Sequence, residues 1–529
     1  MARTKHRFLL VMWMLPVIFA QQTKPLADSQ ILQDKLTAKN QQHYYFPLLP
    51  GAASFRLASS FPPSQNLVVP LSSSLSTKPS SSAASKKPAK SLAPRQLATP
   101  PQQTQKSLYI TLSICSAPLN APPLQLYIST TNDLPGPGKQ DQIIGDGDPT
   151  RSNGSMAGVV NATLPLTGAE RNVYIGVAAP EAAGGVQEWS YEISASSIAP
   201  AYQVSTTPGL ILDDTDATTA LFLTSPFSNT SSPRVSVYVL PDNRVPPALT
   251  RSLCAVNATA NQQPLRPNMT ETTRGAMAGA KYQAVVGGLA PGTSYVGYLV
   301  EESQNRRVMS QPLQFTTKKT NTCKLIFNLP FCTDVAYAVP APQNGSMDPT
   351  ALARAYDQNA QQQYQPFNTT MSQFNCDATA YSLVRNCTDC YRDYKTWLCS
   401  VTIPRCTESE TLGVARNTNG SRNQWIDDQV RPPPYRELLP CIDLCYHVVQ
   451  SCPPFLGFGC PLAGFTSNAS YARWAGPAGK GGADYSAPTC NHMGQLMPAG
   501  GSPSGAANVG PGHFGVWVVT LLSLFQFML

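Results

Sequence analysis

Short runs in which apolar and polar residues alternate fill the chain between residues 105 and 318. Alternation with a period of two is typical of a strand that buries one face, and Gly- and Pro-rich turn segments separate the runs. The predicted strands cover residues 108–112, 124–128, 173–177, 189–193, 220–223, 235–239, 282–286, 295–300 and 313–315. Their spacing predicts two antiparallel β-sandwiches, at 105–198 and 199–318.

Two later segments have apolar residues at helical spacing. Residues 350–364 follow Asp348 and Pro349, a pair that favours the start of a helix. In the segment 442–449, apolar residues recur at helical spacing, and Cys441 and Cys445 lie one turn apart on one face. The chain therefore changes after residue 318 from a mainly β part to a partly helical part.

The N-terminal region lacks such periodicity. Residues 21–104 are rich in Ser, Pro and Lys and cannot bury enough apolar surface to offset chain entropy, so we expect a largely disordered linker. Residues 1–20 place basic residues before an apolar run, the layout of a secretory signal peptide cleaved after Ala20. A signal anchor is the alternative.

The C-terminal region has the layout of a lipid-attachment signal. A flexible spacer at 493–513 contains small residues, with Gly501 and Ser504 as candidate attachment sites, and an uncharged apolar tail follows at 514–529. This layout is typical of a GPI anchor, and a short membrane helix is the alternative. Both predict a protein at the extracellular face of the plasma membrane after maturation in the endoplasmic reticulum.

Composition and glycosylation sequences agree with export. Charged residues make up only 13% of the chain, and of its net charge of +8 residues 1–106 carry +11 and residues 107–529 carry −3, so a basic nucleic-acid-binding face is not expected. N-x-Ser/Thr sequences are used only in the secretory pathway. The candidate sites are Asn153, Asn161, Asn229, Asn257, Asn268, Asn344, Asn368, Asn386, Asn419 and Asn468.

Twelve of the fourteen cysteines lie between Cys323 and Cys490. Zinc is one alternative for such a cluster, but only His447 and His492 lie nearby, so we favour disulfides and expect no metal or cofactor. Cys115 and Cys254 lie in the β-rich part. They tie the two sandwiches together or are free, and the sequence does not decide between these alternatives.

Two acidic clusters are candidate cation sites. They are Asp146 with Asp148, and Asp213 with Asp214 and Asp216, all in turn-like contexts. Calcium prefers several carboxylate oxygens, but neither cluster has the spacing of an EF-hand loop. We therefore expect solvated turns, with calcium binding as the alternative.

The cysteine motifs resemble two known families. The C-x8-C of Cys323 and Cys332, the WLCS motif at 397–400 and the LPCIDLC motif at 439–445 resemble a frizzled-type cysteine-rich domain. The sequences FCTDVAYAVP (331–340) and CPPFLGFGCP (452–461) are similar to the fungal Mid family of extracellular, stretch-responsive calcium-channel subunits. In addition, residues 289–295 and 315–317 resemble the end of a fibronectin type III domain.

These resemblances define the expected fold and crosslinks. The predicted fold class is a mainly β N-terminal part with two β-sandwich-like domains, followed by a disulfide-rich, partly helical frizzled-like domain at 319–492. Frizzled-type pairing implies five disulfides, and the two remaining cysteines form an additional one. The implied pairs are Cys323–Cys406, Cys332–Cys399, Cys390–Cys452, Cys441–Cys490, Cys445–Cys460 and the additional Cys376–Cys387.

The Mid resemblance implies a regulatory subunit of a plasma-membrane calcium channel that supports stretch- or stress-induced calcium influx. Its partner would be a pore-forming, four-repeat channel subunit, with Phe455 and Phe458 as candidate contacts; packing of these rings in the core is the alternative. A frizzled-like lipid- or ligand-binding receptor and a GPI-anchored wall protein are the other functions considered. An enzyme is not expected, because the chain has no G-x-S-x-G, H-E-x-x-H or Walker motif.

Overall fold

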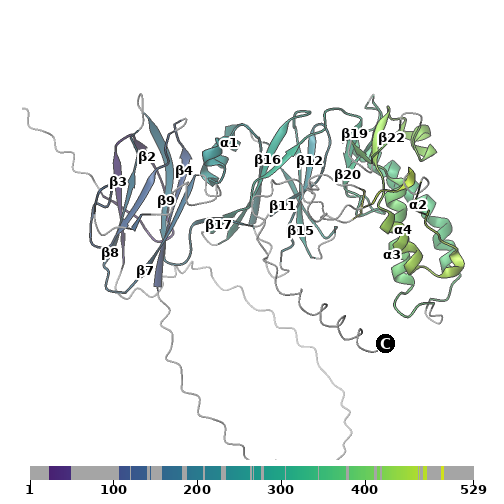
Figure 1. Cartoon of the computed structure of the whole chain (residues 1–529), viewed down its shortest axis with the longest axis horizontal. Coiled ribbons are helices and arrows are strands. Elements are labelled where there is room, and N and C mark those ends of the chain that lie inside the picture. Colours follow the sequence, from purple (N-terminus) through teal and green to yellow (C-terminus); the bar gives the residue numbers. More distant parts are fainter. Residues whose placement is uncertain are drawn as a thin grey trace, which may run out of the picture.

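Three units lie in a row along the longest axis of the molecule: two β-sandwiches and a module that contains helices α2 to α4 (Figure 1). The computed structural model describes residues 23–48, 106–118, 121–139, 143–144, 158–181, 187–206, 209–227, 234–262, 265, 267–275, 279–303, 306–343, 345–376, 381–409, 414–417, 420–462, 464, 469–473 and 490–493. Within these ranges, no helix combines the length and the apolar character needed to cross a membrane.

The first sandwich contains a four-stranded and a five-stranded sheet. The four-stranded sheet has the order β2 (Ile31–Thr37), β9 (Glu188–Ser196), β4 (Lys106–Ser116), β7 (Val159–Leu166). The other sheet has the order β1 (Lys24–Pro25), β3 (Gln41–Pro47), β8 (Asn172–Ala178), β5 (Gln125–Ser129), β6 (Ile143–Ile144). Alternate residues of β4, such as Leu108, Ile110 and Leu112, are fully buried, as a strand with one face on the core requires.

The linker predicted for residues 21–104 is wrong in its first part. Strand β2 pairs with β9 from Ile31 opposite Ser194 to Thr37 opposite Glu188, and β3 buries the rings of Tyr44 and Phe46 in the core. The composition of 21–104 as a whole concealed these two short strands, because the Ser- and Pro-rich residues that follow dominate the average. Residues 49–105 lie outside the described ranges.

The second sandwich also contains two sheets. One has the order β10 (Tyr202–Val204), β17 (Arg306–Met309), β16 (Ser294–Ser303), β13 (Arg234–Pro241), with β18 (Leu313–Thr316) paired to β16. The other has the order β11 (Leu210–Thr215), β12 (Thr219–Thr224), β15 (Lys281–Gly287), β14 (Asn268–Thr272). Phe222 and Phe315 meet edge to face between them, with ring centroids 5.2 Å apart.

The turn between β15 and β16 carries the fibronectin-like feature. Gly292 has a positive φ of 61°, a conformation that glycine adopts without strain. The hydroxyl of Tyr295 accepts a hydrogen bond from the amide of Ala290 at 2.8 Å. A tyrosine that bonds to backbone a few residues upstream is a feature of immunoglobulin-like sandwiches, so the geometry agrees with the resemblance.

Helix α1 (Leu253–Gln262) and a disulfide join the two sandwiches. Cys115 on β4 is bonded to Cys254 on α1, which answers the question that the sequence left open. One cluster of buried apolar residues continues from the first sandwich through Val256 of α1 to Tyr298 and Val300 of β16. The two sandwiches therefore share a core.

The third unit, here called the cysteine-rich module, comprises the described residues from Cys323 to Met493. Its strands are the pair β19 (Cys323–Ile326) and β20 (Tyr337–Pro340) and the sheet β21 (Arg405–Thr407), β23 (Tyr435–Leu438), β22 (Val414–Asn417). Its helices are α2 (Pro349–Ser372), α3 (Cys387–Thr402) and α4 (Ile442–Ser451). The predicted fold class is confirmed: a mainly β N-terminal part precedes a disulfide-rich, partly helical module.

The helix starts follow from their capping residues. The carboxylate of Asp348 accepts hydrogen bonds from the amides of Thr350 and Ala351, which confirms the predicted start of α2. Asn386 and Asp389 form a reciprocal capping box at the start of α3. The helix predicted at 442–449 is confirmed within α4.

Candidate functional site

Six disulfides crosslink the cysteine-rich module. They join β19 to β21, tie the segment after α2 and the segment before β20 to α3, and link α3, α4 and the segment around Cys490. These are the six pairs that the resemblance implies: Cys323–Cys406, Cys332–Cys399, Cys376–Cys387, Cys390–Cys452, Cys441–Cys490 and Cys445–Cys460. These disulfides stabilise the module in addition to its core, because they restrict the conformations of its unfolded chain.

Among the described residues, one group of three side chains has ligand atoms close enough together to hold a metal ion, and the seventh disulfide belongs to it. Cys115, Glu192 and Cys254 bring their ligand atoms together at the joint between the sandwiches. Both sulfur atoms are bonded to each other, so neither is the thiolate that a metal such as zinc requires. This group is a crosslink beside a carboxylate.

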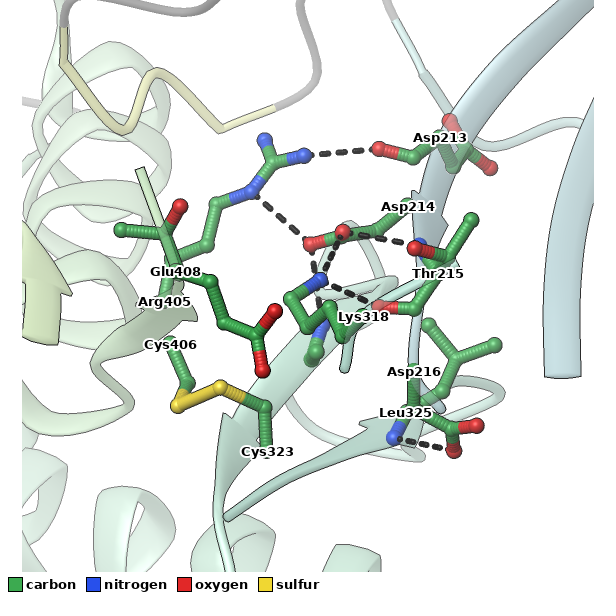
Figure 2. A network of polar contacts seen from close by, with 12 residues as sticks. Asp213, Asp214, Thr215, Asp216, Lys318, Cys323, Leu325, Arg405, Cys406 and Glu408 are labelled. Atoms are coloured by element: carbon green, nitrogen blue, oxygen red, sulfur yellow. Dashed lines mark hydrogen bonds and ion pairs between the residues drawn. A yellow bond between two sulfur atoms is a disulfide. The ribbon is translucent and has the colours of Figure 1, made fainter. Parts of the chain in front are cut away.

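The joint between the second sandwich and the cysteine-rich module is built around the acidic cluster Asp213, Asp214 and Asp216 (Figure 2). The prediction that this cluster forms solvated turns is wrong. Asp213 and Asp214 lie on β11, and side-chain exposures are 8%, 11% and 2% for the three carboxylates in order. The residues around the three aspartates resemble a turn in sequence, and the basic side chains that pair with them come from distant parts of the chain. The local sequence therefore did not predict a buried ionic junction.

Asp214 lies at the centre of the junction. Its carboxylate accepts from Lys318 Nζ at 2.6 Å, from Arg405 Nε at 3.1 Å and from the Ala338 amide at 3.1 Å. Burial alone would raise the pKa of Asp214, but the charges of Lys318 and Arg405 outweigh it and hold the pKa below its ordinary value. This residue of the sandwich therefore binds both a strand and a side chain of the module.

The two neighbouring aspartates complete the contact. Asp216 accepts from the Leu325 amide of the module at 3.1 Å with one oxygen, and from the amides of Thr218 and Thr219, at 2.8 Å each, with the other. Asp213 forms an ion pair with Arg274, and burial raises the pKa of Asp213 in spite of that pair. Carboxylates occupied in this way are poor ligands for calcium, because a cation would have to displace the existing donors.

The module contributes charges of both signs to the junction. Arg405 donates from Nη2 to the carbonyl of Asp213 at 2.7 Å, and its guanidinium lies over the ring of Tyr337 at 5.5 Å. Glu408 accepts from the amides of Lys319 and Thr320 at 2.7 and 2.8 Å, and these bonds outweigh burial and lower the pKa of Glu408. The connecting segment, residues 317–322 between β18 and β19, is thus bound to both units, through Lys318 to the sandwich and through Lys319 and Thr320 to the module.

An apolar contact supports the ionic one. Leu221 of β12 packs against Leu325 and Ala336 of the module, and all three side chains are buried. Arg274, Lys318, Arg405 and Glu408 were not predicted from the sequence, because they lie far along the chain from the groups that they bind. Arg405, for example, lies 191 residues from Asp214. No local pattern signals such a pair.

The two candidate partner contacts have different environments. The ring of Phe458 lies 5.4 Å from that of Tyr394 and 6.3 Å from that of Phe367, within an aromatic cluster between α2 and α3. The ring centroids of Phe455 and Phe374 lie 5.2 Å apart, but 57% of the surface of Phe455 is exposed. Phe458 is therefore partly buried and packs against the core, whereas Phe455 is largely exposed at the surface.

Phe455 belongs to a wider set of exposed apolar side chains, here called the apolar surface. Its members lie on α4, on the loop after α4 and just before α3, and Phe455 contacts Phe374, which packs against the aromatic cluster. They are Leu383, Val384, Tyr446, Val449, Phe455 and Leu462, six of the seven large apolar residues that are exposed in the described ranges. The chain from Leu444 to Ala472 contains no Asp, Glu, Lys or Arg, so most of this surface is also uncharged.

The described glycosylation candidates are mostly at the surface. Asn257, Asn268, Asn368 and Asn386 are exposed, whereas Asn161 is half-buried and accepts a hydrogen bond from Thr111 at 2.9 Å. Other predicted sites fall outside the described ranges. They are Asn153, Asn229, Asn344, Asn419 and Asn468, the attachment candidates Gly501 and Ser504, and the acidic pair Asp146 and Asp148.

The fold and its junctions define a class of protein: a β-rich, multidomain chain whose units are joined by a shared core and a buried ionic contact, and which ends in a module crosslinked by six disulfides. The chain belongs to the Mid1 family, described as "Stretch-activated Ca2+-permeable channel component", which matches residues 107–496. The predicted membership of the fungal Mid family is confirmed.

Three fungal relatives are similar to this chain. The stretch-activated cation channel yam8 of Schizosaccharomyces pombe is 38% identical over 301 residues, 54% of this chain and 61% of the relative. The stretch-activated cation channel MID1 of Saccharomyces cerevisiae is 37% identical, over 40% of this chain and 39% of the relative. MID1 of Cryptococcus neoformans is 26% identical, over 52% and 50%. The matches thus span between about two fifths and three fifths of these relatives.

Solved structures add no functional argument. A glycoside hydrolase domain, Endo-D of Streptococcus pneumoniae, aligns with 40% of this chain and 29% of that chain, at 13% identity and a TM-score of 0.16. That score is too low to indicate a common fold.

Proposed function

We propose that this protein is an extracellular, membrane-attached regulatory subunit of a plasma-membrane calcium channel and supports stretch- or stress-induced calcium influx. The observation that carries the proposal is membership of a family described as a stretch-activated, calcium-permeable channel component, over 107–496. The names of the relatives from two yeasts agree with it. The calcium would pass through a pore-forming, four-repeat subunit, which this chain would bind.

The apolar surface is the best candidate for the contact with that subunit. Interface cores are depleted of charge and enriched in aromatic residues, and the surface around Phe455, Tyr446 and Val449 has this character. Phe458 contributes to the apolar surface indirectly, because it packs in the aromatic cluster against Tyr394. Disulfides Cys390–Cys452 and Cys445–Cys460 fix both ends of the loop that carries Phe455, so its position costs little entropy on binding.

Co-purification of the channel subunit tests this contact. We expect Phe455→Ser to weaken association by about 1–2 kcal/mol, roughly tenfold, because an exposed aromatic anchor is lost without disturbing the core. Ile198→Ser is the matched control, since Ile198 is 80% exposed but lies near the end of the first sandwich. Equal recovery of the channel subunit with both variants would place the contact elsewhere, and failure of the wild-type chain to recover it would overturn the proposed function.

Membrane attachment through a GPI anchor at Gly501 or Ser504 forms part of the proposal. The disulfide content of the described residues is consistent with passage through the secretory pathway. Treatment of intact cells with a phosphatidylinositol-specific phospholipase should release the protein into the medium. Retention on the cells would favour a C-terminal membrane helix instead.

One observation favours a second function, the binding of an acyl chain. A cavity of about 700 Å3 lies between α2 and residues 325–331; Ile326, Leu329 and Phe331 form an apolar part of its lining, and polar side chains of α2 such as Arg354, Asp357 and Gln361 form the other part. This volume falls in the range of small-molecule sites. Protein stripped of lipid should then bind a fluorescent fatty acid, and Ala353→Trp, which fills the cavity from α2, should abolish binding. Stripped wild-type protein that binds no fatty acid would exclude this function.

A further inference from the structure

One glycosylation sequence contains a disulfide cysteine. Asn386-Cys387-Thr388 is an N-x-Thr sequence whose middle residue is bonded to Cys376, eleven residues earlier in the chain. None of the other nine such sequences in the chain has a cysteine at its middle position. The two modifications of this tripeptide, glycan transfer and disulfide closure, therefore involve adjacent residues.

In the folded protein the tripeptide is locked into the start of α3. The side-chain oxygen of Asn386 accepts from the Asp389 amide at 3.0 Å, and the Asp389 carboxylate accepts from the Asn386 amide at 3.2 Å. Thr388 is already helical, and Cys387 is buried. A transferase must hold its acceptor peptide extended, with the Thr hydroxyl near the Asn carboxamide, and the first turn of a helix prevents that geometry.

The folded state nevertheless tolerates a glycan once it is present. Both bonds of the capping box use the Oδ1 atom or the backbone amide of Asn386, and neither uses Nδ2, the atom to which a sugar would be attached. The residue is exposed. Glycosylated and unglycosylated Asn386 can therefore cap α3 in the same way, and the choice between them is made before α3 forms.

We propose that Asn386 is a conditionally glycosylated site, whose occupancy is set by competition between glycan transfer and closure of the Cys376–Cys387 disulfide. In the first reaction, Nδ2 loses a proton and forms a bond to the anomeric carbon of a lipid-linked oligosaccharide, and the lipid pyrophosphate leaves. In the second, the two thiols lose two protons and two electrons to the disulfide of an oxidoreductase, which becomes a dithiol. Whichever reaction occurs first determines the final state.

The competition has a short time window. Cys376 is only eleven residues from Cys387, so both thiols enter the oxidising compartment almost together and the chain between them closes a short loop. Disulfide formation takes seconds or longer, depending on the oxidant and the isomerase. Asn368 provides an internal reference. Its sequence Asn368-Thr369-Thr370 also lies in a helix, near the end of α2, but contains no cysteine.

Site occupancy in the full-length protein tests the proposal. Glycopeptide mass spectrometry of total cellular protein, after enzymatic trimming of the glycans, would compare Asn386 with Asn368 in wild-type and variant chains. Measurement on total protein includes any chains retained inside the cell. In Cys376→Ser we expect the occupied fraction at Asn386 to rise about twofold or more, with Asn368 unchanged.

Cys445→Ser is the matched control, because it removes another short-range disulfide of the same module, with a separation of 15 residues and no adjacent glycosylation sequence. It should leave Asn386 at the wild-type level. A brief pulse of dithiothreitol during synthesis should raise Asn386 occupancy in the wild type but not in Cys376→Ser. The proposal is overturned by full occupancy in the wild type, by no rise in Cys376→Ser, or by an equal rise in Cys445→Ser, which would indicate slower folding in general.

Discussion

At the scale of single residues, the most consequential group is the carboxylate of Asp214. It is buried, and it accepts from Lys318, Arg405 and the Ala338 amide, which belong to the connecting segment and to the module. The acidic cluster was identified from the sequence, but its carboxylates were expected to lie in turns exposed to solvent. The helix cap at Asp348, by contrast, was predicted correctly, because a cap depends only on neighbouring residues.

Removing the Asp214 charge should strongly destabilise the protein. In Asp214→Asn we expect the free energy of unfolding to fall by about 3–5 kcal/mol, because Lys318 and Arg405 remain buried without their counter-charge. Asp242→Asn is a suitable control, since Asp242 lies in an exposed turn and should change stability by less than about 0.5 kcal/mol. Denaturant unfolding measures both, and equal effects would contradict the account of the junction.

The stabilising effect of Asp214 should depend on pH with a defined sign. Its pKa in the folded protein lies below the ordinary 3.8, so its contribution is fully present above that value and is lost as the pH falls through the lower, folded value. The difference in unfolding free energy between wild type and Asp214→Asn should therefore be constant above about pH 5 and shrink in stronger acid. A difference that grows on acidification would contradict this.

At the scale of secondary-structure elements, periodicity predicted many of the strands and the helices α2 and α4, but it missed the 16-residue helix α3 and the 8-residue strand β7. It also missed β2 and β3, which directly precede the Ser- and Pro-rich segment in the sequence and gain stability from pairing with β9 and β8. It also missed α1, whose role depends on a disulfide to β4. These elements are determined by contacts that are distant in sequence, so local patterns cannot reveal them.

The disulfides of the module make its elements mutually dependent. Cys332–Cys399 closes a loop of 67 residues between the segment before β20 and α3, and a crosslink of this length stabilises a fold by about 4 kcal/mol in the chain-entropy model. We expect Cys332→Ser and Cys399→Ser to cause retention in the secretory pathway. Surface labelling of intact cells measures this, and normal surface levels for both variants would contradict it.

At the scale of the whole molecule, the three units act as connected bodies. The shared core and Cys115–Cys254 join the sandwiches, and the ionic junction joins the second sandwich to the module (Figures 1 and 2). Such connections agree with the proposed function, because a flexible joint would absorb a displacement before it reached a partner.

The shared core predicts a single unfolding transition for the two sandwiches. Because Val256, Tyr298 and the residues of β4 belong to one buried cluster, unfolding of either sandwich exposes apolar surface of the other, in addition to the separate core that the second sandwich has between its own sheets. Calorimetry of the fragment from residue 21 to 318 should give one cooperative peak. Two separate peaks in the oxidised fragment would indicate independent domains.

Calcium uptake under membrane stress shows whether the chain supports calcium influx as a channel subunit, as we propose. Fungal cells that lack their own Mid-family protein would be exposed to hypo-osmotic shock, with and without this chain, and surface levels would be determined in parallel. We predict that the wild-type chain restores uptake and that Phe455→Ser restores less of it at the same surface level. Wild-type protein that reaches the surface without restoring uptake would contradict the claim.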